Sequence, residues 1–408
     1  MDIIAEEYNG SQWVAAVDKR TLQGIEVDPL HEIARWGSIY IAKVTRIETS
    51  MNAAFLDLGY EQNGIIFLKD VLLADGSKPK AQKIGQVLRS GQLISVQIKQ
   101  AVNATPDVAK DLPLKEKSSR VSMDITLPGR HLIFTPLSPQ NRVSKRVRNK
   151  TLRKNMTAML DSLTSMNGFI LRSSAANAQT DVLIREAKIL NALWDSLCPF
   201  LAEESEPNLI MLGPDAVQRL LSDFATENIG RIAVATIDQF QDIEDWCELY
   251  APDLVTKIDP AKEDETVTRL GLFETYGIVD QIDGLLRPYT FLPSGGNLVI
   301  QSTAALMAID VNQGLDKSII NTNIEAARHA AQQIRMRNIG GVILIDFINM
   351  NDKKQRDKVW EALENELARD ACTVDIHGWT RTGLLEITRA RRTPTLQDKA
   401  ELSEADFS

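Results

Sequence analysis

The sequence predicts an α/β protein of several domains, and three observations carry this prediction. At ~100–200 residues per domain, a chain of 408 residues forms two to four domains. Residues 36–100 contain short strand patterns at regular spacing, which is typical of a small β-barrel. Residues 290–390 alternate strand and helix patterns, which indicates an α/β unit.

The first half of the chain is mostly β by pattern. Residues 1–35 read as short strands, with Trp13 in a buried run. Strands of the barrel segment are expected at residues 38–47, 53–59, 64–68 and 93–98, with a loop around residues 75–86. Residues 120–175 continue as strands with a basic connector. Helices at residues 182–203 and from Pro214, followed by a strand at 231–236, predict an α/β arrangement.

The pattern is most regular in residues 290–390. Strands at 297–301 and 305–310 form a hairpin around Ser302 and Thr303. A helix follows, capped by Asn321 or Asn323 and stopped at Gly340, then a strand at 342–347, a second helix and a strand at 384–389. The polar residues 393–408 are expected to fray.

Composition excludes several classes of protein. The net charge of −9, from 46 basic and 55 acidic residues, argues on average against a nucleic-acid binder. No apolar run reaches the ~18–20 residues of a membrane span, and the start lacks a signal-peptide pattern. Three scattered cysteines and four scattered histidines give neither a disulfide framework nor a zinc motif. We therefore expect a cytoplasmic protein whose metal chemistry, if any, uses carboxylates.

Two carboxylates are candidates for that chemistry. Asp310 and Asp346 each end an apolar strand, and Asn312 faces the same side as Asp310 if its strand continues. On adjacent strands these oxygens form the hard ligand set that Mg²⁺ or Mn²⁺ prefers, suited to phosphodiester cleavage. The alternative is that each aspartate is only a turn residue at a strand end, and the pattern leaves that open.

A local basic segment offsets the acidic average. Residues 141–154 hold seven basic side chains and no acidic one: Arg142, Lys145, Arg146, Arg148, Lys150, Arg153 and Lys154. Further arginines recur at Arg389, Arg391 and Arg392. Such a segment binds phosphates or is simply a solvated loop or helix face.

Three more side chains have both a binding and a structural interpretation. Phe55 and Phe67 lie in the barrel segment, where aromatic rings can stack on bases, although the apolar run around Phe67 favours a core position for it. Arg172, followed by hydroxyls, ends a strand and either binds a terminal phosphate or faces solvent.

Five sequence blocks occur in an order that resembles the catalytic half of the ribonuclease E/G family of endoribonucleases. They are residues 292–296, 308–312, 321–327, 338–348 and 383–389, and the resemblance extends to about residue 392. It implies a ribonuclease-H-like unit from residues 1–35 and 212–272, with an inserted S1-like OB barrel at 36–118 and a 5′-sensor subdomain at 119–211. A DNase-I-like α/β catalytic domain follows at 273–392, and residues 393–408 form a polar tail.

The resemblance also implies an activity. Asp310 and Asp346 match the family's metal-ligand aspartates, and Asn312 matches the asparagine that helps to hold them. An enzyme with this set binds Mg²⁺ or Mn²⁺ and cleaves single-stranded RNA to 5′-phosphate and 3′-hydroxyl ends.

Other matches concern the RNA. Arg172 and Ser173 match the pair that reads a 5′-monophosphate, with Gly129 and Ile133 at the backbone and apolar positions of that pocket. The remaining matches are RNA-contacting positions at Phe55 and Lys117 and a basic pair at Lys145 and Arg146.

The chain departs from the family pattern in places. No cysteine follows Arg392, so we expect neither zinc nor a zinc-linked tetramer, while a homodimer stays open. Ile65 stands at an RNA-contacting aromatic position, and Ala304, Thr373 and Pro288 replace a glutamate, a basic residue and an arginine. These departures motivate an alternative, an RNA-binding protein of the same family with weak or no nuclease activity.

Overall fold

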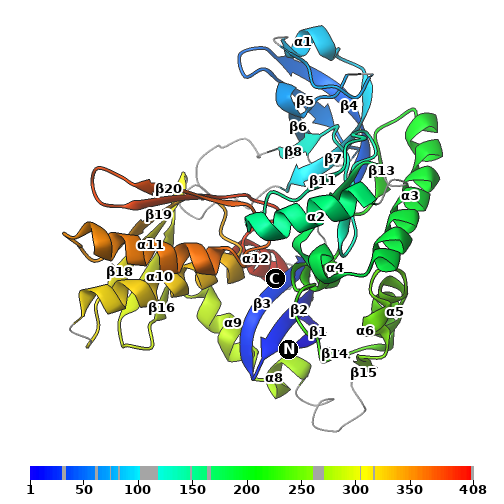
Figure 1. The fold of residues 1–408 in the computed structure, drawn as a ribbon. Helices are drawn as coiled ribbons and strands as arrows, with labels where there is room; N and C mark the ends of the chain where they lie inside the picture. Colours follow the sequence, from blue (N-terminus) through cyan, green and yellow to red (C-terminus); the bar gives the residue numbers. More distant parts are fainter. Residues whose placement is uncertain are drawn as a thin grey trace. The chain divides into compact units, whose positions relative to one another are not determined.

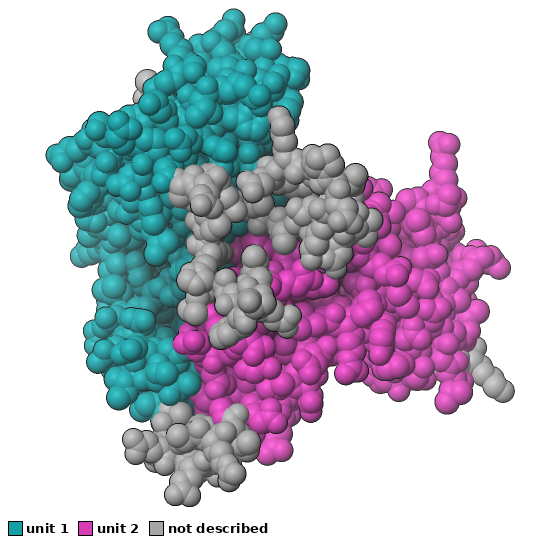
Figure 2. Space-filling model, turned by 180° about the vertical axis from the view of Figure 1, so that it is seen from behind, with its two compact units in different colours: residues 1–5, 31–102, 116–262 teal, residues 6–30, 103–115, 263–408 magenta. Residues whose placement is uncertain are grey.

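A computed structural model gives the fold of the chain (Figure 1). It describes residues 1–29, 34–59, 63–73, 75–80, 83–101, 118–147, 149–162, 167–260, 271–303, 305–315 and 318–405. The chain forms two compact units (Figure 2). Unit 1 consists of residues 1–5, 31–102 and 116–262, and unit 2 consists of residues 6–30, 103–115 and 263–408.

Unit 1 contains a closed five-stranded barrel. Its strands are β4 (Ile39–Glu48), β5 (Ala53–Asp57), β6 (Asn63–Phe67), β7 (Leu93–Gln100) and β8 (Ser119–Ser122). The order β4-β5-β6-β8-β7 is closed by a β4–β7 pairing, with β6 and β8 parallel and the other pairs antiparallel. This arrangement is consistent with an OB-like unit. The short helices η1 (Leu68–Asp70) and α1 (Ile84–Val87) lie between strands, and β13 (Asn208–Met211) pairs with β4.

A second sheet of unit 1 has the order β11-β12-β10-β9. Its strands are β9 (Leu127–Pro128), β10 (Leu132–Phe134), β11 (Arg142–Val143) and β12 (Phe169–Leu171), and the helices that follow its strands are α2 (Lys150–Ser162), η3 (Ser173–Asn177) and α3 (Thr180–Glu203). Phe134 stacks on Phe169 with ring centroids 4.7 Å apart. The expectation that residues 120–175 hold only strands and a connector is wrong, because α2 buries Met156 and Leu160 at helical spacing.

The N-terminal strand joins a distant part of unit 1. The first residues of β1 (Asp2–Tyr8) pair in parallel with β14 (Arg231–Val234), which pairs in parallel with β15 (Ile258–Pro260). The nearby helices are α4 (Ala216–Asp223), α5 (Ile237–Tyr250) and α6 (Pro252–Val255).

Unit 2 is built around a six-stranded sheet of order β16-β17-β18-β19-β21-β20. The strands are β16 (Tyr289–Phe291), β17 (Asn297–Ser302), β18 (Leu306–Asn312), β19 (Gly341–Asp346), β20 (Val374–Trp379) and β21 (Leu385–Arg389). The hairpin of β2 (Ser11–Asp18) and β3 (Thr21–Pro29) also belongs to unit 2, as do α8 (Leu272–Thr275), α9 (Val279–Leu286), α10 (Ile319–Met336), α11 (Lys353–Leu367) and α12 (Leu396–Ala405). The predicted hairpin of β17 and β18 is confirmed by their antiparallel register, but its turn begins after Ser302, which still lies in β17 and pairs with Met307.

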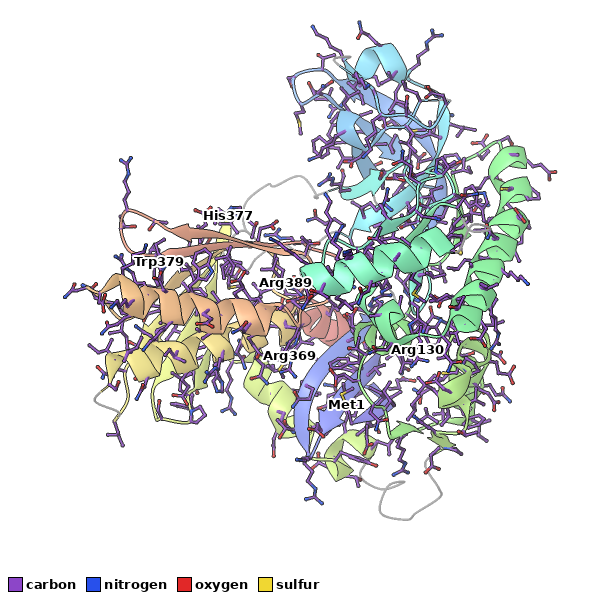
Figure 3. All side chains as sticks on the ribbon, viewed as in Figure 1. Met1, Arg130, Arg369, His377, Trp379 and Arg389 are labelled. Atoms are coloured by element: carbon purple, nitrogen blue, oxygen red, sulfur yellow. The ribbon has the colours of Figure 1, made fainter. Side chains whose placement is uncertain are left out.

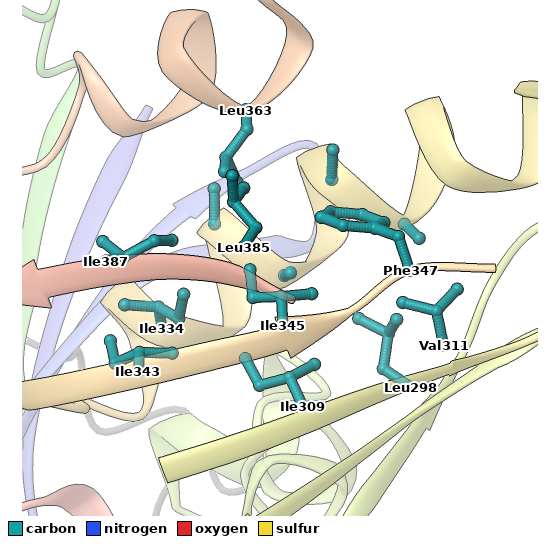
Figure 4. Packing of buried hydrophobic residues seen from close by; sticks show 14 of the residues in the cluster. Leu298, Ile309, Val311, Ile334, Ile343, Ile345, Phe347, Leu363, Leu385 and Ile387 are labelled. Carbon is teal, nitrogen blue, oxygen red and sulfur yellow. The ribbon is translucent and has the colours of Figure 1, made fainter. Parts of the chain in front are cut away.

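Helices α10 and α11 cover one face of this sheet. Side chains alternate along each strand, so Leu298, Ile309 and Ile345 turn inward and pack with Ile334 of α10 and Leu363 of α11 (Figure 4). The opposite face, here called the open face, carries the alternate residues Asn297, Val299, Asp310, Asn312 and Asp346.

Two expectations for unit 2 are wrong. The N-cap of α10 is Ser318, whose side chain accepts from the Asn321 amide at 3.4 Å, and neither Asn321 nor Asn323 has that role. Residues 396–405 do not fray but form α12, in which Lys399 is buried and donates to the Val27 carbonyl. In the described part of the chain, no helix combines the length and apolar character that crossing a membrane requires.

Candidate active site

The register of β18 and β19 brings the two strand-end carboxylates together. Asp310 and Asp346 are direct partners in this parallel pair, and both are exposed. Partner residues point to the same face, on strands about 4.8 Å apart. The two aspartates therefore form one pair on the open face, as their positions at the ends of apolar strands led us to expect.

The amide of Asn312 holds one member of this pair. Its Nδ2 donates to Asp310 Oδ2 at 3.0 Å and to Asn297 Oδ1 at 3.2 Å. Asn297 is the partner of Asn312 across the hairpin, so the hairpin register supplies this second acceptor. The sequence analysis does not identify Asn297, because a turn at Ser302 and Thr303 gives a different register from the one that pairs Asn297 with Asn312.

A pocket of about 560 Å³ opens beside the carboxylates. Its lining includes Asp310, Asp346, Phe347 and Trp379, and Arg356 is the one lysine or arginine in that lining. Trp379 lies on β20 (Figure 3), with its ring 5.8 Å from that of Phe347. The pocket thus places a cation and an apolar wall next to the acidic pair.

A glycine turn packs against the chain that leaves β18. The Leu292 amide donates to the Gly296 carbonyl at 2.7 Å, which closes the turn. A Cβ on Gly296 would lie 2.6 Å from the Asn312 carbonyl oxygen, and one on Gly314 would lie 2.2 Å from the Gly295 backbone. Glycine is required because two backbones approach each other more closely than a side chain permits. This turn therefore determines where the backbone of Asn312 lies.

The chain leaving β19 is held by Asn323. This buried side chain of α10 donates to the Ile348 carbonyl at 2.7 Å and accepts from the Ile348 amide at 3.1 Å. The helix thereby fixes the backbone two residues beyond Asp346. The sequence pattern suggested Asn323 only as a helix cap.

The donor set suits a hard cation. Within the residues that the structure describes, no group of three or more His, Cys, Asp or Glu side chains is arranged so that it could hold a metal ion. A divalent ion at the aspartate pair would have two protein carboxylates, and water and a substrate phosphate would complete its shell. Mg²⁺ is commonly bound in this way, through one or two carboxylates and phosphate oxygens.

The candidate phosphate sensor lies in unit 1. The Arg172 guanidinium donates to the Gly129 carbonyl at 3.0 Å and the Ser222 carbonyl at 3.2 Å, and it lies 3.8 Å from the Asp223 carboxylate. Ser173 is exposed at the start of η3, and Ile133 is half-buried on β10. The structure therefore brings Arg172 and Gly129 into direct contact and binds the guanidinium to protein acceptors.

A buried carboxylate, that of Glu186, contacts the backbone that follows Gly129. Glu186 of α3 accepts from the His131 amide at 2.9 Å and the Leu132 amide at 3.1 Å. A Cβ on Gly129 would lie 2.0 Å from Glu186 Oε1, which explains the glycine. Burial raises the pKa of Glu186 to about 7, while burial and the neighbouring Arg130 lower the pKa of His131 to about 4. Arg130 (Figure 3) is paired with Asp253.

The barrel presents aromatic rings on its outer face. The Arg46 guanidinium lies 4.5 Å above the half-buried Phe55 ring, and Phe55 faces Ile65 across the sheet. Phe67 lies on the same face as Ile65, with Arg120 over its ring at 5.6 Å. The expected core position of Phe67 is therefore wrong. Lys117 lies outside the described residues.

The basic segment divides into exposed and structural residues. Lys145 and Arg146 are exposed in the turn after β11. Arg153 instead donates to the Ser144 carbonyl at 2.9 Å and the Val143 carbonyl at 3.2 Å, so it serves the fold. Exposed with the basic pair are Arg142, Lys150 and Lys154, whereas Arg148 is outside the described residues. Arg389 (Figure 3) is buried in an ion pair with Asp370 at 2.8 Å.

Comparison with known proteins identifies the family. The model of the ribonuclease E/G family matches residues 126–392. A ribonuclease G of Haemophilus influenzae is 30% identical over 399 residues, which cover 94% of this chain and 78% of the relative. A ribonuclease G of Salmonella typhimurium is 31% identical over 394 residues, covering 93% of this chain and 77% of the relative. A ribonuclease E of Haemophilus influenzae is 27% identical over 405 residues, which are 95% of this chain but 41% of the relative.

A family model that matches most of the chain defines its class, that of the nucleases that act on RNA. The chain belongs to the ribonuclease E/G family, and is thus a member of an enzyme family. The family expected from the sequence blocks is confirmed.

Proposed function

We propose that the protein is a metal-dependent endoribonuclease that cleaves single-stranded RNA and leaves 5′-phosphate and 3′-hydroxyl ends. The observation that carries the proposal is the register of β18 and β19, which makes Asp310 and Asp346 direct neighbours on an exposed face. Membership of a family of ribonucleases supports the choice of RNA as substrate.

The residues around the pair have separate roles in this proposal. Asp310 and Asp346 hold a divalent ion, Mg²⁺ or Mn²⁺, which when bound supplies an activated water and charge neutralisation at the phosphate. Asn312 keeps the Asp310 carboxylate oriented through its 3.0 Å hydrogen bond. Arg356, in the adjoining pocket, neutralises a phosphate of the bound strand.

The barrel binds the RNA strand in this proposal. Phe55 and Phe67 share the outer face with Arg46 and Arg120, and aromatic rings beside guanidinium groups are a surface on which successive bases stack. Lys145 and Arg146 add exposed positive charge elsewhere in unit 1.

We also infer a preference for RNA with a 5′-monophosphate. Arg172 supplies the charged donor, Ser173 an exposed hydroxyl, Gly129 the close backbone and Ile133 an apolar wall. Binding a phosphate there exchanges protein acceptors of Arg172 for phosphate oxygens, which favours the dianionic monophosphate over a hydroxyl end.

Cleavage of a defined oligoribonucleotide tests the proposal. A 5′-monophosphorylated single-stranded RNA is incubated with the protein in Mg²⁺ or in EDTA, and products are resolved by length and end group. We expect Mg²⁺-dependent internal cleavage that Asp310→Asn or Asp346→Asn abolishes. Asp357→Asn, an exposed acid on α11, is the matched control and should retain activity.

Three outcomes would each contradict a part of the proposal. Cleavage that persists in both the Asp310→Asn and the Asp346→Asn variant would contradict the catalytic role of the carboxylate pair. RNA binding without Mg²⁺-dependent cleavage by the wild type would instead establish the alternative, an RNA-binding protein of this family. Equal rates on monophosphate and hydroxyl 5′ ends would contradict the role of Arg172.

A further inference from the structure

The edge strand β16 exposes two aromatic rings. Tyr289 is 39% exposed and Phe291 is 68% exposed. Their rings are in edge-to-face contact, with centroids 5.6 Å apart and an interplanar angle of 72°. Single exposed apolar residues are common, but a contacting pair on one strand is a defined apolar patch.

Strand register places this pair on the face that carries the carboxylates. Tyr289 pairs with Val299, Val299 with Asp310, and Asp310 with Asp346. Direct partners point to the same side of a sheet, so all four side chains lie in one row across the open face. With strands about 4.8 Å apart, the Tyr289 backbone lies about 10 Å from that of Asp310.

The neighbouring row repeats the arrangement. Phe291 pairs with Asn297, and Asn297 pairs with Asn312, the residue that holds Asp310. In the first row, the uncharged Val299 separates Tyr289 from Asp310. In the second row, the uncharged Asn297 separates Phe291 from Asn312. The start of β16 is anchored by the Ile300 amide, which donates to the Pro288 carbonyl at 2.7 Å.

We propose that Tyr289 and Phe291 form a stacking platform for bases of single-stranded RNA next to the phosphodiester at Asp310 and Asp346. This inference rests on the proposed function. Aromatic rings bind the faces of all four bases, so the platform gives grip and alignment without strict sequence selection. It aligns the strand across the sheet, perpendicular to β18, from the rings to the carboxylates.

The geometry favours RNA over a second copy of the chain. The rings project from the face of the sheet, in line with the carboxylates, whereas pairing with another sheet edge uses backbone groups in the plane of the sheet. β16 is only three residues long, which is a poor template for edge pairing.

The test measures base stacking and cleavage separately. Oligoribonucleotides carry 2-aminopurine at successive positions around the cleaved bond, and its quenching is recorded with Asp310→Asn protein in EDTA, so that binding does not depend on cleavage. In that background, Tyr289→Ala with Phe291→Ala should abolish quenching at the positions next to the cleaved bond. In the otherwise wild-type protein the same double variant should raise KM about ten-fold or more, in line with the strength of base–aromatic stacking.

Matched variants show that the effect belongs to the rings. Tyr289→Phe with Phe291→Tyr keeps both rings and should restore quenching and KM. Phe200→Ala removes a ring of similar exposure, 59%, in unit 1 and should change neither.

The outcomes distinguish this inference from the proposed function. Unchanged KM and quenching in the double alanine variant overturn the platform, even if cleavage depends on the carboxylates as proposed. Ring-dependent quenching in a protein that does not cleave supports the platform and contradicts the proposed function. A wild-type dimer that becomes monomeric in the double variant, with RNA binding unchanged, overturns the platform in favour of contact between copies.

Discussion

Replacing Gly296 by alanine should impair catalysis without unfolding the protein. The new Cβ would lie 2.6 Å from the Asn312 carbonyl oxygen, where ordinary contact is 3.4–4 Å, so that the Asn312 backbone must retreat by about 0.8 Å. Asn312 orients Asp310 through a 3.0 Å hydrogen bond, so the displacement reaches the carboxylate pair. Misplacement of a catalytic group by ~1 Å can cost ~100-fold in rate, and we therefore expect kcat to fall about 10- to 100-fold.

The assay pairs cleavage rates with the free energy of unfolding. Single-turnover cleavage of a monophosphorylated oligoribonucleotide gives the rate, and urea unfolding followed by circular dichroism gives stability. Gly284→Ala is the control, because it sits inside α9 and its Cβ position has no heavy atom within 4 Å apart from its own helical backbone and chain neighbours. It should keep full activity and gain up to ~1 kcal/mol of stability. A Gly296→Ala protein as active as wild type would refute the coupling between turn and carboxylate.

Three further predictions concern other parts of the chain. Asn323→Ala leaves the partly buried Ile348 amide and carbonyl without this partner and should cost about 1–3 kcal/mol in urea unfolding, whereas an unchanged midpoint would contradict that role. Phe55→Ala should weaken binding of single-stranded RNA about ten-fold by fluorescence anisotropy, and Phe55→Trp should retain it. The folded-state pKa of Glu186, about 7, is above its ordinary 4.5, so its contribution to stability is full at low pH and is lost as pH rises through about 7. Glu186→Gln should therefore reduce the fall in unfolding free energy between about pH 5 and pH 8, and an unchanged pH profile would refute the raised pKa.

The carboxylate pair could be predicted because its signal is local. An aspartate directly after an apolar run identifies a strand end, and the alternation of strands and helices indicated that Asp310 and Asp346 lie on neighbouring strands. The observed register pairs the two aspartates directly. Because β18 and β19 are parallel, their carboxyl ends lie at the same edge of the sheet.

Other positions depend on contacts that no local pattern reveals. Asn323 binds Ile348 across the unit, and a buried asparagine in a helix reads in sequence like a cap. The core position predicted for Phe67 is wrong because the outer face of β6 is itself apolar, so the run containing Ile65 and Phe67 hides the alternation of the strand. Likewise, no local pattern shows that Tyr289 shares a face of the sheet with the carboxylates, because this follows only from strand pairing.

The pairing of β1 with β14 has a consequence for how the chain is made. Asp2 pairs with Arg231, so this edge of β1 gains its partner strand only after about 230 further residues have been synthesised. At ~5–20 residues per second, that interval is on the order of ten seconds to most of a minute. All five barrel strands are complete about halfway through it. Unit 2 closes later still, because the buried Lys399 of α12 donates to the Val27 carbonyl of β3. The barrel can therefore fold while translation continues, whereas the unit with the carboxylate pair also needs α12.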